Sequence, residues 1–517
     1  MQLARLFRPP LRPRWASLGM ALGAGAAVGL GQAPLGWWPV ALIGLAGLLH
    51  MMAASLRPGQ VAWLGFAAGF GYALSTLYWI VEPFFVEPEI YGWMAPFALV
   101  LMAAGMGAFW ALGAGIGALA GQGRAARGLG AALGLAGMDA LRSYVFTGFP
   151  WALLGHVWID TPVAQAAGWI GPLGLGALTV LLAGGPIAVS TRGARLGAGA
   201  AGVAVLAGLW MWGAERLSEP MPERFDAPVI RIVQPNAEQH LKWLPEHRLE
   251  YFYRHLDLTA APPAEGEPRP DLIVWPETAV PFLLDRAGEG LEMIAEAANG
   301  RPVALGIQRS EGARYYNSLA VIAPDATVAG LYDKAHLVPF GEYIPFGDVM
   351  ARFGIAAFAA QQGNGYSAGP GARLLDLGAL GKVAPLICYE AIFPQDLRGV
   401  GARPDWLLQV TNDAWFGNTS GPWQHLAQAR MRAIEQGLPM VRAANTGISA
   451  LIDARGQVVE MLGLGVIGTI DARLPPGLDQ PPYARWGDWP ALGFIVALWA
   501  FLAFTARNRV DRKSTSL

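Results

Sequence analysis

The stretch VAPLICYEAIFP, residues 383–394, decides the fold of the more polar half of this chain. Its first part, Val383–Ile387, is an apolar run of the length typical of a buried strand, and it leads directly into Cys388, Tyr389 and Glu390. In open α/β sheets the functional residues lie at the carboxyl ends of strands. A cysteine after an apolar strand is also common as simple core packing, so its role depends on what accompanies it.

Two other segments repeat this arrangement. DLIVWPETAVPF, residues 271–282, is a strand of the buried type that ends near Glu277, and YDKAHLVPFGEYIPF, residues 332–346, carries Lys334. Each has an ordinary explanation when taken alone, because a glutamate can begin a helix and a lysine can lie in a turn. Together they supply what a nucleophilic thiol needs, namely a base for its proton and a positive charge for an oxyanion. We therefore expect Glu277 to be the acid–base group, Lys334 to stabilise the oxyanion and Cys388 to be the nucleophile.

The residues around these segments predict a layered α/β domain, because strand-like runs recur with helical stretches between some of them. The expected strands are Val229–Val233, Leu272–Val274, Val303–Ile307, Ser318–Ile322, Val383–Ile387 and Trp406–Val410. The expected helices include Leu291–Asn299 and Trp423–Gln436. The sequence leaves the order of the strands open.

The remainder of the chain is apolar enough for a membrane. Of its 517 residues, 54% are hydrophobic and only 15% are charged, whereas soluble proteins carry about 25% charged residues. A helix that crosses a bilayer needs roughly 20 apolar residues. We expect eight such spans, approximately Ala16–Gln32, Trp37–Ala54, Val61–Ile80, Trp93–Gly121, Gly128–Val145, Val163–Ser190, Ala194–Gly213 and Trp489–Ala506. Asp139 and Arg142, three residues apart on the fifth of them, are expected to pair with each other.

Basic residues predict the orientation of these spans. Arginines cluster before the first span and after the second, fourth, sixth and eighth, whereas the intervening loops contain acidic residues and neither lysine nor arginine. Because basic loops stay on the cytoplasmic side, both termini are expected there and the polar domain outside. The expected organisation is a membrane domain of seven helices over residues 1–220, a catalytic domain over 221–478, and an eighth helix with a cytoplasmic tail over 479–517.

Composition also argues against several classes of function. The net charge of −1 provides no bulk attraction to nucleic acid. The seven histidines and the single cysteine do not have the spacing of a zinc site. We therefore expect no metal and no other cofactor.

The three segments together resemble the Glu-Lys-Cys signature of the nitrilase superfamily. Seven leading spans and one trailing span narrow the resemblance to the apolipoprotein N-acyltransferase family, and it extends over essentially the whole chain. It implies an α-β-β-α sandwich for the polar domain and assigns the catalytic roles to Glu277, Lys334 and Cys388. It also implies supporting or substrate-binding roles for Glu342, Tyr389, Glu390, Asn317 in YYNSL, Trp243 in HLKWLP, Pro345, and, in LRSYVFTGFPW, Arg142, Gly148 and Trp151. TNDAWFG, residues 411–417, matches the strand and loop after the nucleophile.

The function that the resemblance implies is a two-step acyl transfer in the bacterial inner membrane, with the catalytic domain in the periplasm. The thiol takes an acyl chain from a phospholipid, and the thioester passes it to the N-terminal amine of a diacylated lipoprotein. The expected partners are this donor, this acceptor and membrane lipids, and the chain is expected to be a monomer. The acyl-chain preference is not implied.

Two alternatives use the same features differently. The first is a membrane-anchored amidase of the nitrilase type, in which water attacks the thioester, although eight spans exceed what an anchor needs. The second is a polytopic protein without enzymatic activity, such as a transporter with a degenerate outer domain. An intact set of Glu277, Lys334 and Cys388 argues against the second.

Overall fold

The computed structural model describes residues 13–514 except 56, 122, 190, 223, 225, 264–267 and 346–364, with side chains up to residue 505. The chain divides into two compact units. A helical unit comprises Met1–Val81, Ile90–Glu219 and Pro481–Leu517, and an α/β unit comprises Glu82–Glu89 and Pro220–Gln480. Each unit is described by itself below.

The α/β unit contains two six-stranded sheets, with the strand orders β12-β1-β2-β3-β4-β5 and β11-β10-β9-β8-β7-β6. The first sheet consists of β1 (Val229–Gln234), β2 (Leu272–Val274), β3 (Val303–Glu311), β4 (Arg314–Ile322), β5 (Val328–Asp333) and β12 (Gly468–Arg473). The second consists of β6 (Leu375–Asp376), β7 (Lys382–Ile387), β8 (Trp406–Thr411), β9 (Met440–Ala444), β10 (Ser449–Ile452) and β11 (Val458–Leu462). Strands β1, β2 and β3 run parallel, as do β7, β8 and β9. Strands β12, β4, β6 and β10 are antiparallel to these central strands, and the edge strands β5 and β11 are antiparallel to β4 and β10.

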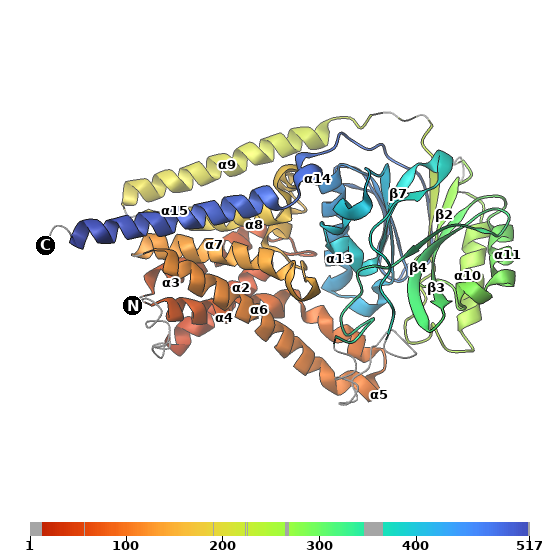
Figure 1. Cartoon of the computed structure of the whole chain (residues 1–517), viewed down its shortest axis with the longest axis horizontal. Coiled ribbons are helices and arrows are strands. Elements are labelled where there is room, and N and C mark those ends of the chain that lie inside the picture. The colour runs from red at the N-terminus through yellow and green to blue at the C-terminus, as the bar shows by residue number, and fades with distance from the viewer. Residues whose placement is uncertain are drawn as a thin grey trace. The chain divides into compact units, whose positions relative to one another are not determined.

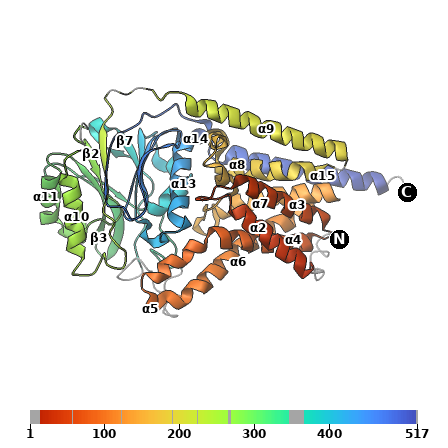
Figure 2. The ribbon, with the colours of Figure 1, turned by 180° about the vertical axis from the view of Figure 1, so that it is seen from behind.

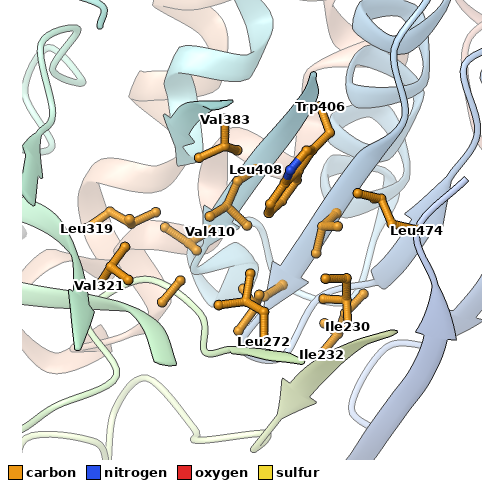
Figure 3. Close-up of a cluster of buried hydrophobic side chains, with 14 of the residues drawn as sticks. Ile230, Ile232, Leu272, Leu319, Val321, Val383, Trp406, Leu408, Val410 and Leu474 are labelled. Carbon is orange, nitrogen blue, oxygen red and sulfur yellow. The ribbon is translucent and has the colours of Figure 1, made fainter. Parts of the chain in front are cut away.

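The two sheets pack face to face. Ile230 and Ile232 of β1 belong to the same buried cluster as Trp406, Leu408 and Val410 of β8, as Figure 3 shows. Because side chains alternate between the two faces of a strand, every second residue of these strands enters this layer. The shared layer fixes the spacing of the two sheets.

Helices cover the outer face of each sheet. Phe252 of α10 (Arg248–Ala260) and Ile294 of α11 (Gly288–Ala297) pack in one cluster with Ile273 of β2, and Figure 1 shows both helices outside the first sheet. Ala429 of α13 (Ser420–Gln436) packs in another cluster with Leu407 of β8, and Figure 2 shows α13 outside the second sheet. The unit is therefore an α-β-β-α sandwich, as expected.

All six expected strands are present, and the two expected helices correspond to α11 and α13. Strands β5, β6, β9, β10, β11 and β12 and helix α10 were not expected. Their local signals are weak because β6 has two residues, β10 has four, and the sequence MVRAA of β9 contains an arginine. Pairing with neighbouring strands, rather than intrinsic preference, makes these segments strands.

Among the described residues, the helical unit contains eight longer helices, joined by connections of different lengths that include short 3₁₀ turns. These are α2 (Trp15–Gly29), α3 (Trp38–Ala54), α4 (Pro58–Thr76), α6 (Ala95–Gly117), α7 (Arg124–Arg142), α8 (Ala167–Gly184), α9 (Arg192–Ser218) and α15 (Trp489–Ser514), with α14 (Pro482–Trp486) as a short element. The short helix α5 (Pro88–Tyr91) includes residues of both units. Small residues let α6 and α7 approach closely, since a Cβ added to Gly134 would come within 2.0 Å of the Gly113 carbonyl oxygen.

The prediction of eight spans is not confirmed. Among the described residues three helical segments are long and apolar enough to cross a membrane, namely Pro88–Ala120, Pro162–Ala188 and Arg192–Ser218. A fourth is counted if Pro58–Thr76 and Tyr78–Phe85, bent by 50°, form one span.

Length and charge explain the smaller number. Helix α2 has 15 residues and α3 has 17, which at about 1.5 Å per residue is shorter than a hydrocarbon core of about 30 Å. The apolar part of α15, Trp489–Thr505, is similarly short. Helix α7 is not among the candidate spans because it carries four charged residues, Arg124, Arg127, Asp139 and Arg142.

Candidate active site

Glu277, Lys334 and Cys388 each lie just beyond the end of a strand. Lys334 directly follows β5 and Cys388 directly follows β7, while Glu277 comes three residues after β2. The relative exposure of the three is 5%, 1% and 6%, respectively. Strands β2 and β5 belong to one sheet and β7 to the other, so both sheets contribute to the same buried group of side chains.

The Glu277 carboxylate is held by three donors. Its Oε1 accepts a hydrogen bond of 2.6 Å from Asn317 Nδ2 and lies 3.5 Å from Lys334 Nζ. Its Oε2 accepts a hydrogen bond of 2.8 Å from the backbone N–H of Asn412. Because both oxygens are engaged, the carboxylate has a fixed orientation, which suits a proton acceptor.

Glu342 is the main partner of Lys334. Its Oε1 lies 2.9 Å from Lys334 Nζ and accepts a second hydrogen bond, of 3.0 Å, from Asn317 Nδ2. Burial alone would lower the pKa of Lys334, but Glu342 and Glu277 raise it above the usual value for lysine. Lys334 therefore stays protonated, as an oxyanion donor must, and Asn317 links the two carboxylates.

Cys388 occupies an unusual backbone conformation. Its φ is +51°, in the left-handed region that residues with a side chain rarely adopt, and it opens a short 3₁₀ turn, Cys388–Ile392. Burial raises the pKa of the Cys388 thiol, Glu277 raises it further, and Lys334 opposes both. The thiol is therefore protonated at neutral pH, and a base has to remove its proton as it attacks.

Glu390 connects the nucleophile strand to the segment that carries Lys334. Its Oε2 accepts a hydrogen bond of 2.8 Å from the Ile387 N–H, and its Oε1 accepts bonds from Tyr332 Oη at 2.7 Å and the Ala335 N–H at 2.8 Å. Burial raises the pKa of Glu390 to about 7, although these donors oppose the shift.

Three other expected residues of the α/β unit have the following surroundings. The Tyr389 ring packs edge-on against Phe393, with 5.0 Å between ring centroids. Trp243 is half-buried beside the ammonium of Lys242, which lies 5.3 Å from its ring centroid. Pro345 is half-buried in a turn.

Arg142, Gly148 and Trp151 form a cluster within the helical unit. Arg142 pairs with Asp139 at 3.1 Å, as expected, and donates to the carbonyl oxygens of Phe149 and Trp151 at 2.6 and 2.7 Å. Gly148 has φ +90°, which favours glycine. Trp151 is fully buried, with its ring centroid 4.6 Å from that of Trp79 in the same unit. The roles that the resemblance gives to these three residues stay predictions.

Several residues near the site were not found from the sequence. Lys242 donates to Thr278 Oγ1 at 3.0 Å and to the Glu277 carbonyl oxygen at 3.4 Å, and burial lowers its pKa to about 8. The only feature of the sequence that pointed to Lys242 was its position directly before Trp243. Asn412 lies in the TNDAWFG match, whereas His425 had no signal of its own.

Known proteins resemble the chain along almost its whole length. The family model described as Apolipoprotein N-acyltransferase N-terminal domain matches residues 24–185, and the one described as Carbon-nitrogen hydrolase matches residues 230–480. An apolipoprotein N-acyltransferase of Rhodopseudomonas palustris is 38% identical over 96% of each chain, and one of Caulobacter vibrioides is 39% identical over 97% of each. The chain belongs to the apolipoprotein N-acyltransferase family.

Membership of the apolipoprotein N-acyltransferase family confirms the resemblance drawn from the sequence and makes the chain an enzyme, so the transporter interpretation does not apply. Solved structures resemble about half of the chain more distantly. An amidase from Nesterenkonia sp. is 20% identical, covering 50% of this chain and 94% of its own, with a TM-score of 0.37. A carbon-nitrogen hydrolase from Helicobacter pylori is 15% identical, covering 54% and 94%, with a TM-score of 0.36.

Proposed function

We propose that this chain transfers a fatty acyl group from a membrane phospholipid, through a thioester on Cys388, to the amine of the diacylglyceryl-cysteine at the N-terminus of apolipoproteins. N-acylation of apolipoproteins is the activity of its family, and it sets the class of acceptor. The observation that carries the residue assignment is the buried group in which Lys334 and Asn317 contact both Glu277 and Glu342 and in which Glu277 and Lys334 act electrostatically on Cys388.

In the first step Cys388 Sγ attacks the ester carbonyl carbon of the phospholipid while Glu277 takes the thiol proton. The resulting oxyanion is stabilised by the Lys334 ammonium, and a donor of this kind is worth about 10²–10³-fold in rate. The tetrahedral intermediate then expels the alkoxide of the lysophospholipid, which takes the proton back from Glu277. The raised pKa of the thiol favours such concerted proton removal over a preformed thiolate.

In the second step the acceptor amine attacks the thioester carbonyl, and Glu277 takes the proton that the amine loses. The bond to Sγ breaks, and the thiolate recovers a proton from Glu277 as the amide is released. Glu342 holds Lys334 in place through both steps, at 2.9 Å. Exclusion of water from the buried site keeps the thioester for the amine.

The supporting residues take roles that follow from their contacts. Asn317 orients the two carboxylates, and Glu390 ties the Lys334 segment to the nucleophile strand. Tyr389, Trp243 and Pro345 contribute the surroundings of the site. Arg142, Gly148 and Trp151 are assigned to the substrate-binding segment at the outer membrane face on the resemblance alone.

We further propose that the enzyme is a monomeric, multi-pass protein of the inner membrane with its catalytic domain in the periplasm, organised as residues 1–220, 221–478 and 479–517. The candidate spans support a membrane protein, and the distribution of arginines between the loops supports the orientation. Both substrates are anchored in lipid, so a site at the outer leaflet receives them by lateral diffusion.

The test is to incubate the full-length protein in detergent with phospholipid and a synthetic diacylated lipopeptide, and to separate the products by mass spectrometry. The proposal predicts N-acylated lipopeptide and lysophospholipid in equal amounts. Release of free fatty acid in place of acylated peptide would instead support the amidase-like alternative with water as acceptor. A Cys388→Ala variant is the control and should form neither product.

A further inference from the structure

A network of buried polar side chains lies behind the nucleophile, and the two-step reaction described above does not use it. Its members share complete burial, with 0% relative exposure each: Gln409, Thr411, Asp413, His425 and Arg442. Burying charged groups is costly unless they are paired and hydrogen-bonded. The question is what this network supports.

Asp413 contacts both Arg442 and His425 in this network. Arg442 Nη2 donates to its Oδ2, and its Oδ1 lies 2.9 Å from His425 Nδ1. Burial alone would raise the pKa of Asp413, but Arg442 and His425 hold it at about 2. Burial and Arg442 lower the pKa of His425. We assign the proton of the neutral imidazole to Nδ1, because it faces a carboxylate oxygen that can only accept.

The other end of the network converges on the backbone of Cys388. Gln409 Nε2 donates one hydrogen to the Cys388 carbonyl oxygen at 3.3 Å. It donates its other hydrogen to His425 Nε2 at 3.1 Å, because that nitrogen carries no proton and can only accept. His425 Nε2 lies 3.1 Å from the same carbonyl oxygen without donating to it. The orientation of the Gln409 amide is fixed, because its Oε1 accepts a hydrogen bond of 2.6 Å from Arg442 Nη1. Asp413 and Arg442 thus set the positions of the two side chains that touch the nucleophile's carbonyl.

This carbonyl belongs to the residue with the left-handed backbone, φ +51°. Because a peptide group is planar and trans, fixing the direction of the Cys388 carbonyl also fixes its ψ and the opposite direction of the Tyr389 N–H. The position of this side chain relative to the preceding strand depends on φ, and its position relative to the following turn depends on ψ. Loss of the contacts at the carbonyl therefore lets the turn relax and moves Sγ relative to Glu277 and Lys334.

We propose that His425, held by Asp413, is a positioning residue for acyl transfer, which orients the Gln409 amide and through it fixes the Cys388 carbonyl and the backbone turn that presents Sγ. It acts through Cys388 and does not touch the substrate. This inference rests on the proposed function, since it takes Cys388 as the thiol that accepts the acyl group.

Two variants of His425 separate the two ends of the imidazole. In asparagine the amide nitrogen is as many bonds from Cβ as Nδ1 is in histidine, so His425→Asn keeps a donor for Asp413 and loses the acceptor that orients the Gln409 amide. In glutamine the amide oxygen is as many bonds from Cβ as Nε2 is, so His425→Gln keeps an acceptor for the Gln409 amide and loses the donor to Asp413. The Nε2 contact is the one that matters for positioning.

The experiment measures single-turnover thioester formation on the full-length protein with phospholipid in detergent. We expect His425→Asn to lower the rate constant by about 10²-fold, the order that a misplacement of about 1 Å costs. The concentration of donor at half-maximal rate should change less than about twofold. His425→Gln should retain the rate constant to within about tenfold.

The rate constant separates positioning from a structural role, since partial misfolding lowers the amplitude of the acylation burst and leaves its rate constant unchanged. A wild-type rate constant in His425→Asn, or an equal loss in both variants, would overturn the inference. If His425→Asn does not fold, Gln409→Glu serves instead, because it keeps the size and the Arg442 partner but removes the donor to the Cys388 carbonyl. It should lose about 10²-fold, and a wild-type rate constant would count against the inference. Absence of any thioester on the wild-type protein would refute the proposed function itself, which is a different outcome.

Discussion

Replacing Glu277 with glutamine tests the assignment of the base. Glutamine has the same shape but cannot accept the thiol proton, and it brings an amide group into a site made of donors. The two Glu277 oxygens accept from Asn317 Nδ2 at 2.6 Å and from the Asn412 N–H at 2.8 Å. Whichever way the new amide turns, its NH₂ group faces one of these donors.

The expected loss follows from these contacts. General acid–base catalysis is worth about 10²–10⁴-fold, so Glu277→Gln should slow thioester formation by about 10³-fold, or about 4 kcal/mol of barrier. The NH₂ group of the new glutamine and the donor that it faces repel each other, which tilts the side chain and adds to this loss. Burial has already raised the pKa of the Cys388 thiol, so little thiolate forms without the base.

Glu342→Gln is the matched comparison. Glu342 contacts Lys334 at 2.9 Å and the Val338 N–H at 2.8 Å, and it acts through the lysine rather than on the thiol. We expect thioester formation to be at least tenfold faster in Glu342→Gln than in Glu277→Gln, a difference in barrier of about 1.4 kcal/mol. Glu342→Gln should slow transfer to the acceptor amine more than it slows the first step.

The assay is single-turnover measurement of both half-reactions in each variant, with a Glu277→Gln/Glu342→Gln double variant as a control for coupling. Lys334 and Asn317 each contact both carboxylates, so the two losses should not be additive. If Glu342→Gln blocks thioester formation as completely as Glu277→Gln, the two acids work as one unit and the separate assignment is wrong.

Two further predictions concern topology and pH. A phosphatase fused within the catalytic domain should be active and one fused after Arg512 inactive, and the reverse pattern would contradict the assigned orientation. The low pKa of Asp413, about 2, means that its charge stabilises the fold above about pH 4 and that this contribution, of about 2 kcal/mol, is lost as the pH falls towards 2. The difference in unfolding free energy between the wild type and Asp413→Asn, followed by tryptophan fluorescence, should therefore shrink over that range, and a constant difference would mean that Asp413 does not carry this charge.

The parts of the site that could be predicted each carry a local signal. Cys388 directly follows an expected strand and Glu277 nearly so, and an apolar run that ends in a reactive side chain is visible within one segment. Lys334 follows β5, which was not expected, and its signal was the segment YDKAHLVPFGEYIPF that contains it. The number of spans could not be predicted equally well, since hydropathy does not show where a helix ends. Helix α2 stops at Gly29 after 15 residues, before the expected end of this span at Gln32.

The network behind Cys388 lies beyond the reach of sequence patterns for a different reason. Gln409 comes from β8, His425 from α13 and Arg442 from β9, and these elements meet only through the packing of the second sheet and its helix. An arginine within the short run MVRAA has the pattern of an exposed strand residue, yet Arg442 is completely buried. Such side chains acquire their roles from tertiary contacts.

The central claim is that Cys388 carries the acyl group, and intact-mass analysis of the full-length protein after incubation with phospholipid alone tests it most directly. Because Cys388 is the only cysteine of the chain, the adduct has a single possible thioester site. The account predicts one added acyl mass that neutral hydroxylamine removes and that Cys388→Ala lacks. An acyl adduct that persists in Cys388→Ala, or a wild-type protein that releases lysophospholipid without any adduct, would contradict it.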